Sequence, residues 1–233
     1  MKLPANDTAI LFFSRSASEE CRHKRFVPEE SNGANIKICR TLISSTRSII
    51  DQSDLPVFTV GYSEQQGTTF GQRFSNALQF VFGQGYEKII AIGNDCPLLS
   101  QKDIHEAALH LHNGNNVLGP TIDGGIYLLG IRKDNFNIGK FANLAWQSSQ
   151  LFSDIIDYFN IERAKPQLLK KRRDLDGEAD LWVLVRKHAK SPVVQTLKEI
   201  LYASRSYKNT DYIDPNFVSQ FHQSLGLRGP PTY

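Results

Sequence analysis

The stretch "IIAIGNDCPLLSQKD", residues 89–103, joins an apolar run of strand length to an acidic turn. Four apolar residues lead directly into Gly93, Asn94 and Asp95, and a proline follows at position 97. A carboxylate at the edge of a core costs free energy unless a positive charge lies against it. Asp95 therefore needs a partner, either a basic side chain or a bound cation.

The composition is that of a globular protein and sets few limits on function. The chain has 233 residues, of which 40% are hydrophobic and 22% charged, which predicts one large domain with a tail. A net charge of +3 suits an anionic small molecule or nucleic acid and does not choose between them. The 3 cysteines are widely spaced and indicate neither a disulfide framework nor a zinc site.

Targeting signals are also lacking in the sequence. The N-terminal segment has no apolar signal core, and no window approaches the roughly 18 apolar residues of a membrane helix. We therefore expect a cytoplasmic protein with no membrane partner.

Patterns typical of strands and helices alternate along the chain. Apolar runs predict strands at residues 9–14, 56–60, 88–92, 116–120 and 126–131, with a short apolar piece at 167–169. Helical periodicity or capping predicts helices over residues 35–51, 70–81, 100–112 and 148–159, and again from about 178 onward. Residues 15–32 form a long charged loop of the kind that carries function.

This alternation predicts an α/β fold with a mostly parallel sheet covered on both faces. Ligands bind such sheets beyond the carboxyl ends of the strands, where Asp95 is expected. The core domain is expected to span residues 1–190, and residues 191–233 form a helical extension. That extension packs either on the domain or on a second subunit, which leaves a homodimer open.

Several common chemistries find no support. The chain has no Walker-type loop ending in Lys-Ser or Lys-Thr, and "GQGY" at 83–86 precedes a strand where a Rossmann fingerprint must follow one. No Gly-x-Ser-x-Gly elbow or His-Glu-x-x-His helix is present. The basic run at 170–173 reads better as solvated surface or as phosphate neighbours than as a nucleic-acid site. Nucleic acid is therefore not an expected partner.

Acidic residues remain as candidates for chemistry. Asp95, Asp123, Asp174 and Asp176 lie in three loops that the predicted sheet brings to one end. One or two carboxylates together with phosphate oxygens are typical ligands of Mg²⁺. Each residue also has a plain structural interpretation, as a turn residue, as part of a "DGG" hairpin signal, or as a helix cap. The combination, rather than any single residue, favours a cation site.

Longer blocks resemble a bacterial family described as glycosyltransferase-like. The blocks are "IGNDCPLL", "LGPTIDGGIYLLGIR", "RRDLDGEADL", "QGTTFGQRF" and "AWQSSQLF", which together span about residues 9–185. The resemblance implies the three-layer nucleotide-diphospho-sugar transferase (GT-A) fold. Wider relatives include the guanylyltransferases that make molybdenum cofactor and 2-phospholactate derivatives.

The resemblance also implies roles for individual residues. It assigns Asp95 to the catalytic centre and to the Mg²⁺ or Mn²⁺ ion, and Asp176 as a second metal ligand. Asp123, with Gly124 and Gly125, is expected on the sugar or acceptor side, where Asp123 would orient or deprotonate the acceptor. The two glycines also let backbone approach a ligand closely, since they lack Cβ.

The loop after the first strand departs from the family pattern. In "FSRSASEECRHKRF", residues 13–26, Glu20 replaces a glycine, His23 replaces a lysine and Lys24 stands where threonine is expected. The basic residues of the loop could still clamp a diphosphate. We assign nucleotide binding to Arg15, Lys24 and Arg25, and to Arg73 on the following helix, for which an ion pair is the alternative.

These features together predict a metal-dependent transferase. It would use a nucleotide-activated donor, a nucleotide or nucleotide sugar, and pass a glycosyl or nucleotidyl group to a small acceptor. The alternative is a non-catalytic GT-A-fold binding protein whose N-terminal nucleotide loop has degenerated.

Overall fold

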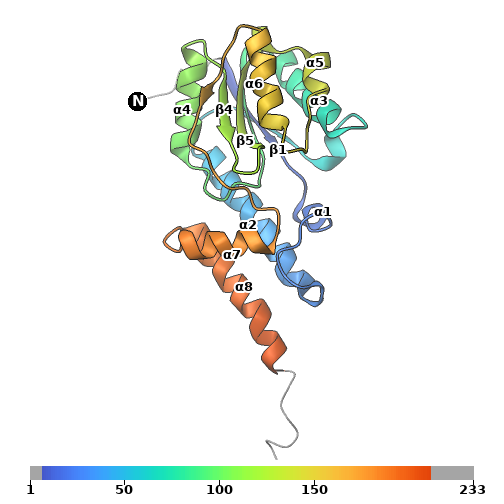
Figure 1. Ribbon diagram of the computed structural model, residues 1–233, viewed down its shortest axis with the longest axis vertical. Coiled ribbons are helices and arrows are strands. Elements are labelled where there is room, and N and C mark those ends of the chain that lie inside the picture. Colours follow the sequence, from blue (N-terminus) through green and yellow to red (C-terminus); the bar gives the residue numbers. More distant parts are fainter. Residues whose placement is uncertain (1–6, 211–233) are drawn as a thin grey trace, which may run out of the picture.

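The computed structural model describes residues 7–210, apart from the side chains of Glu30 and residues 206–210. A six-stranded sheet with the order β2-β1-β3-β5-β4-β6 forms its centre (Figure 1). The strands are β1 (Thr8–Phe13), β2 (Val57–Val60), β3 (Lys88–Ile92), β4 (Val117–Pro120), β5 (Ile126–Arg132) and β6 (Gln167–Leu168). Among these strands, β5 alone runs antiparallel to its neighbours. The predicted mostly parallel sheet is confirmed.

The longer helices also lie where periodicity and capping predict them. They are α2 (Asn32–Asp51), α3 (Phe70–Gly83), α4 (Gln101–His112), α6 (Leu151–Ile161), α7 (Glu178–Lys187) and α8 (Pro192–Thr210). Ser100 and Asp103 form the expected capping box of α4. Shorter pieces are α1 (Ala17–Glu20), α5 (Ile138–Ala142), η1 (Glu29–Ser31), η2 (Tyr62–Glu64) and η3 (Lys133–Asn135).

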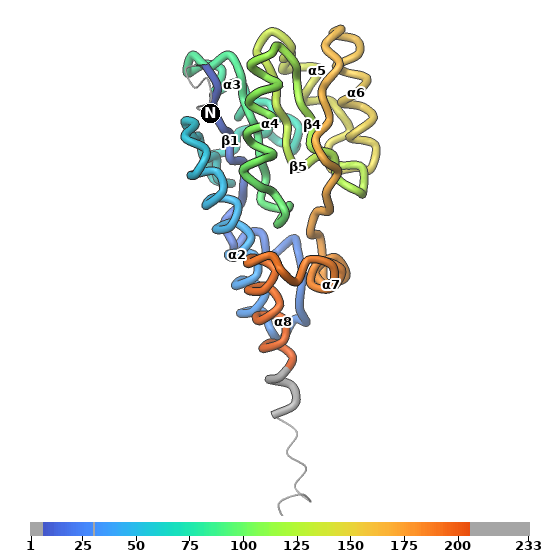
Figure 2. The backbone as a smooth tube through the Cα atoms, turned by 90° about the vertical axis from the view of Figure 1, so that its left-hand side faces the viewer, coloured from blue at the N-terminus to red at the C-terminus, as the bar shows by residue number. Residues whose placement is uncertain are grey.

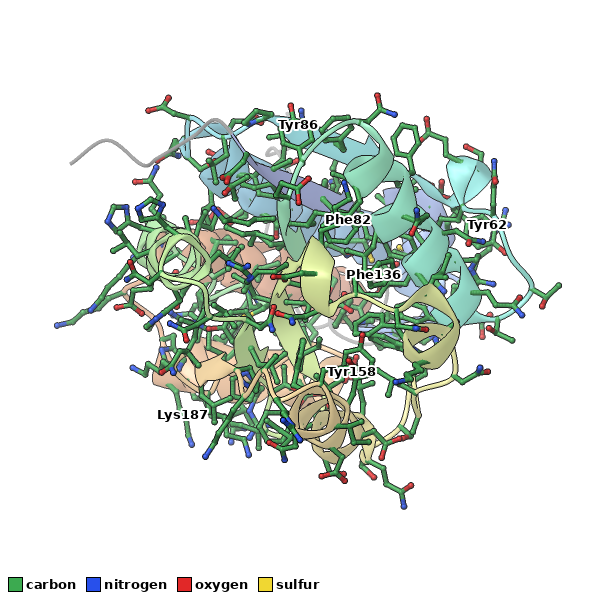
Figure 3. All side chains as sticks on the ribbon, turned by 90° about the horizontal axis from the view of Figure 1, so that it is seen from above. Tyr62, Phe82, Tyr86, Phe136, Tyr158 and Lys187 are labelled. Carbon is green, nitrogen blue, oxygen red and sulfur yellow. The ribbon has the colours of Figure 1, made fainter. Side chains whose placement is uncertain are left out.

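Helices cover both faces of the sheet, because the strands are apolar on both sides. Leu11 of β1 packs in one cluster with residues of α3, α5 and α6, and Ile10 packs in another with residues of α2 and α4. Figure 1 shows α3, α5 and α6 on one side of the sheet and α4 on the other. On the first side, the rings of Phe82 and Phe136 lie 5.3 Å apart (Figure 3). The result is the expected three-layer arrangement.

A third apolar cluster lies beyond the carboxyl ends of β1 and β3. The N-terminal half of α2 projects past the sheet and packs against α7 and α8, as Figure 2 shows. Phe26 and Leu175, each fully buried, bring two loop segments into this cluster. The helical extension thus packs on its own chain through Leu201, and residues 211–233 of the predicted extension lie outside the described residues. Within residues 7–210, none of the helices combines the length and apolar character that a bilayer span requires.

Candidate functional site

A cleft of about 670 Å³ opens between the carboxyl ends of the strands and the third cluster. Its charged lining comprises Arg15, Glu20, Lys24, Asp95, Asp123, Asp174 and Asp176, and its aromatic lining comprises Phe13, Phe70, Phe74, Tyr127 and Trp146. This volume falls within the range of small-molecule sites. The cleft lies where a parallel sheet places its ligand.

Asp95 is held at the end of β3 by contacts with two other segments. Ser14, just after β1, donates a hydrogen bond of 3.2 Å from Oγ to the buried Asn94 Oδ1 and so ties the ends of β1 and β3 together. The backbone N–H of Leu175 donates to the Asp95 carbonyl oxygen at 2.9 Å. Asp176, the next residue, is thereby brought beside Asp95.

The segment that carries Asp174 and Asp176 is anchored along the sheet before it reaches the cleft. Beyond β6, the N–H of Leu169 donates to the carbonyl oxygen of Leu118 at 2.8 Å, and the N–H of Arg172 donates to that of Pro120 at 3.0 Å. The Arg172 guanidinium donates to both carboxylate oxygens of Asp103, at 2.8 and 2.6 Å. This ion pair fixes the segment two residues before Asp174.

The N-terminal loop enters the cleft through a clamp made by Asn35 on α2. The buried Asn35 side chain accepts a hydrogen bond from the N–H of Phe26 at 2.8 Å and donates to the carbonyl oxygen of Lys24 at 2.9 Å. Arg25 forms a parallel bridge with Gly177. Neighbouring side chains of extended backbone point to opposite sides, so Lys24 faces the cleft and Arg25 does not.

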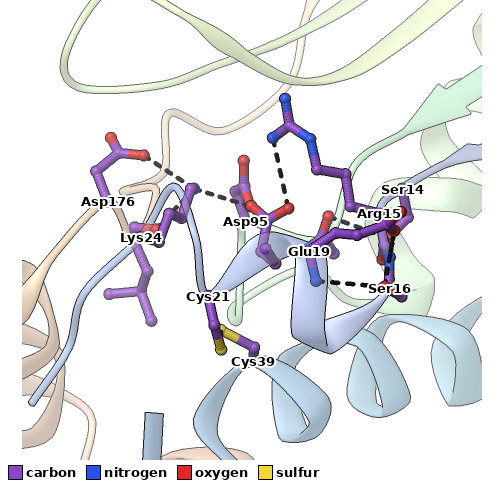
Figure 4. Close-up of polar contacts among 12 residues, drawn as sticks. Ser14, Arg15, Ser16, Glu19, Cys21, Lys24, Cys39, Asp95 and Asp176 are labelled. Carbon is purple, nitrogen blue, oxygen red and sulfur yellow. Dashed lines mark hydrogen bonds and ion pairs between the residues drawn. The ribbon is translucent and has the colours of Figure 1, made fainter. Parts of the chain in front are cut away.

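The Lys24 ammonium lies between the two acids that were expected to hold a metal (Figure 4). Its Nζ is 2.9 Å from Asp95 Oδ1 and 2.9 Å from Asp176 Oδ1, and it donates to the Leu175 carbonyl oxygen at 2.9 Å. Burial alone would lower the pKa of Lys24, but the charges of Asp95 and Asp176 outweigh it and raise the pKa above its usual value. Lys24 is therefore charged, with a hydrogen bond to the Leu175 carbonyl oxygen and an ion pair to each of the two acids.

Two other acids of the cleft have pKa values raised above the ordinary range. Burial, together with the negative charges of Asp95 and Asp123, raises the pKa of Asp174 to about 8, and its Oδ1 is buried without a hydrogen-bond partner. Burial and the charge of Asp95 likewise raise the pKa of Glu20, although Arg15 lies 3.6 Å away. Strongly perturbed carboxyl groups in a cleft are typical of functional sites.

The structure brings most of the predicted site residues together but not all. Asp123 lines the cleft and accepts a hydrogen bond from Thr121 Oγ1 and one of 3.4 Å from the N–H of Gly125. Gly124 does not line the cleft; it has a φ of +95° and packs against the backbone of Ser149, where a Cβ would clash. As a glycine, Gly124 can adopt the positive φ that the turn between β4 and β5 requires.

Two of the predicted nucleotide-binding residues lie outside the cleft lining. Arg25 is more than half exposed and pairs with Glu29 at 3.5 Å. Arg73 donates to the Thr68 carbonyl oxygen at 3.1 Å, within its own helix start. Neither arginine is placed to contact the acids of the cleft. The Arg25 side chain points away from the cleft, and the Arg73 guanidinium is bonded to the backbone just before α3.

Sequence reasoning counted Asp174 among the acids expected at one end of the sheet but did not choose it as a metal ligand, and it counted Glu20 only as a departure from a pattern. A signal for Asp174 was present, because residues 174 and 176 are two apart in a segment that reads as extended, and such side chains share one face. Glu20 gave no comparable signal. Its place in the cleft depends on the turn of α1, which a Ser16–Glu19 capping box starts.

The donor set suits a divalent cation in chemistry. Carboxylate oxygens of Asp95 and Asp176 converge on one point, which the Lys24 ammonium marks as a place where positive charge is stabilised. Among the described residues, no group of three His, Cys, Asp or Glu side chains forms a complete metal cage. Mg²⁺ characteristically uses one or two carboxylates and completes its shell with phosphate oxygens and water. The residues therefore fit a cation shared with a ligand.

Comparison with known proteins agrees with this fold. Residues 45–148 match the model of a family described as "Uncharacterized protein conserved in bacteria (DUF2064)". The expected resemblance to a bacterial family is thus confirmed. No curated protein matches the chain.

Solved structures place the fold more fully. A "putative nucleotide-diphospho-sugar transferase" from Desulfovibrio desulfuricans G20 is 20% identical, with 87% of this chain and 98% of that chain covered and a TM-score of 0.72. Rv0371c of Mycobacterium tuberculosis, solved with manganese, is 13% identical over 78% of this chain and 100% of that chain, with a TM-score of 0.43. The first similarity shows that this protein has the nucleotide-diphospho-sugar transferase fold.

Proposed function

We propose that the protein is a transferase that uses a nucleotide-activated donor and passes a glycosyl or nucleotidyl group to a small acceptor. One observation carries the proposal: Asp95 and Asp176, from segments far apart in the sequence, converge on a single positive charge in the cleft. The fold supports it, because the cleft lies where sheets of this kind bind ligands.

The proposed roles follow from what each group can do. Asp95 and Asp176 would hold Mg²⁺ or Mn²⁺, and a cation there would neutralise charge that develops on a diphosphate leaving group. Arg15 lies in the same cleft and can donate hydrogen bonds to phosphate oxygens. The Phe70–Phe74–Trp146 part of the aromatic lining offers flat apolar surfaces for a base or sugar.

Asp123 is proposed to face the acceptor. Its hydrogen bonds from Thr121 and Gly125 fix its orientation at the turn after β4. A carboxylate held in this way can orient an acceptor hydroxyl or accept its proton.

A thermal-shift screen of nucleotides and nucleotide sugars, with and without Mg²⁺ or Mn²⁺, tests the proposal. A ligand that binds only the native state raises its apparent stability, so we expect a shift only when nucleotide and metal are both present. Asp95→Ala should abolish the shift. Asp51→Ala, at the exposed end of α2, is the control and should retain it. If no nucleotide shifts the melting temperature, or if the shift is the same with and without metal, the proposal is contradicted.

Glu20 favours a second candidate, a binding protein without turnover. Its buried carboxyl group lies among the acids of the cleft and adds negative charge where the resemblance expects a phosphate loop. Nucleotide binding with no consumption of any donor, measured by chromatography of the reaction mixture, would support this candidate. Consumption of one donor would exclude it.

A further inference from the structure

Lys24 occupies the place that the proposed function gives to a cation. Its Nζ lies 2.9 Å from each of the two carboxylates and is also bonded to the carbonyl oxygen of Leu175. Only 12% of the Lys24 side chain is exposed, so the ammonium has exchanged most of its water for these three oxygens.

Two positive charges cannot share this point. The oxygens that contact Lys24 are the ones that would contact a cation, and like charges at such a separation repel strongly in a partly buried site. Without its two acids, the Lys24 ammonium would lie in a partly buried place with uncompensated charge, which is unfavourable. Lys24 must therefore leave its position when a cation arrives.

The cleft gives the released ammonium a new partner of opposite charge. Lys24 lines the same cleft as Arg15, and its backbone stays fixed through the bond from Asn35. A diphosphate bound with the cation would bring negative oxygens within reach of the side chain. An ammonium is well suited to a phosphate as a point charge.

We infer that Lys24 is an internal competitor of the divalent cation, which pairs Asp95 and Asp176 in the free protein and moves to the substrate phosphates when the cation binds. The inference rests on the proposed function, because it requires a cation at these two acids. Metal alone should then bind weakly, and metal with a nucleoside diphosphate more tightly. The competition makes the free cleft a poor metal site and the substrate-bound cleft a good one.

Titration with Mn²⁺ alone, followed by electron paramagnetic resonance, tests the competition. Lys24→Gln should bind Mn²⁺ roughly tenfold more tightly than the wild type, or more, because the competing charge is gone. Arg15→Gln is the matched control: it removes the same charge from the same cleft but leaves Lys24 between its acids. It should change Mn²⁺ affinity several-fold less. Equal gains in both variants, or none in Lys24→Gln, overturn the inference.

Labelling of lysines in the wild type keeps the test valid if Lys24→Gln does not fold. Lys88 is a matched internal control, with a side chain 11% exposed and an ion pair of 2.7 Å to Asp7 at the opposite end of β3. Saturating Mn²⁺ should raise the rate of Lys24 modification by an amine-reactive ester several-fold and leave Lys88 unchanged. An unchanged Lys24 in protein that binds Mn²⁺ refutes the inference and leaves the proposed function standing. If wild type and variant bind no Mn²⁺ with or without a nucleoside diphosphate, the metal site of the proposed function fails, and the inference with it.

Discussion

The segment after β6 contributes to two clusters of charged side chains, one around Arg172 and one around Asp174, and the two clusters differ in how their charges are paired. Arg172 donates to both carboxylate oxygens of the buried Asp103, and Asp103 Oδ2 also accepts hydrogen bonds from the backbone N–H and the hydroxyl of Ser100. Two residues further on, Asp174 has an oxygen that is buried without a partner. The first cluster pairs its carboxylate and the second leaves a carboxyl group uncompensated.

The difference separates anchoring from function. Asp103 also caps α4, so its cluster joins that helix to the segment beyond β6 and fixes where Asp174 and Asp176 begin. Unpaired acids in the cleft destabilise the free protein, and a ligand that supplies positive charge would relieve the cost. The predictions below test this contrast from the larger effect to the smaller.

Removal of the anchor should have the largest effect on stability. Asp103→Ala leaves the Arg172 guanidinium without its partner and removes the cap of α4. We expect a loss of about 3–5 kcal/mol in the free energy of unfolding, measured with urea. Asp157→Ala, an exposed change on α6, is the control and should cost less than about 0.5 kcal/mol. A similar small cost for both changes would show that the anchor contributes nothing.

Neutralisation of the cleft acid should have the opposite sign. Asp174→Asn removes a carboxyl group that lacks a partner, so the free protein should gain on the order of 1–3 kcal/mol at pH 8. Because the pKa of Asp174 rises from 3.8 to about 8, the folded protein holds a proton that the unfolded chain releases between these values. The contribution of Asp174 to the free energy of unfolding therefore falls as pH rises from 3.8 to about 8.

The gain from Asp174→Asn should accordingly be small near pH 4 and largest near pH 8. Asp176→Asn is the matched control, because Asp176 is a partner of Lys24 and its loss should bring no gain. Urea unfolding at several pH values measures both variants. A gain that does not vary with pH would contradict the assignment of an uncompensated carboxyl group.

The smallest expected effect on stability is that of replacing Arg25, which lies outside the cleft. Arg25→Ala breaks an exposed pair with Glu29 and should change stability by less than about 0.5 kcal/mol. It should also leave nucleotide affinity unchanged in calorimetric titration. Arg15→Ala should weaken that affinity about tenfold, since a hydrogen bond to a charged group is lost. Equal losses in both variants would contradict the placement of the cleft.

Much of the fold could be predicted from local patterns. The apolar run at residues 88–92 and the capping box at Ser100 were sufficient for β3 and α4, because burial and capping act over a few residues. Helix α5 was missed, since five residues are too few to show a period of 3.6. Helix α1 was missed as well, although its capping box is visible in the sequence.

The site was predictable only in part. Acids that follow strands of a parallel sheet must meet at one edge, so Asp95 and Asp123 could be placed from connectivity alone. Which of Lys24 and Arg25 faces the cleft could not be predicted, because it depends on the hydrogen bonds of Asn35 and on the bridge between Arg25 and Gly177. These contacts are set by tertiary packing rather than by any local pattern.

Titration of the Asp174 carboxyl carbon by nuclear magnetic resonance tests the central contrast most directly. In the free protein we expect its pKa to be near 8, well above the ordinary value of 3.8. Added Mg²⁺ and a nucleoside diphosphate should lower that pKa markedly, because a cation in the cleft favours the charged carboxylate. A pKa near the ordinary value, unaffected by metal and nucleotide, would contradict the account.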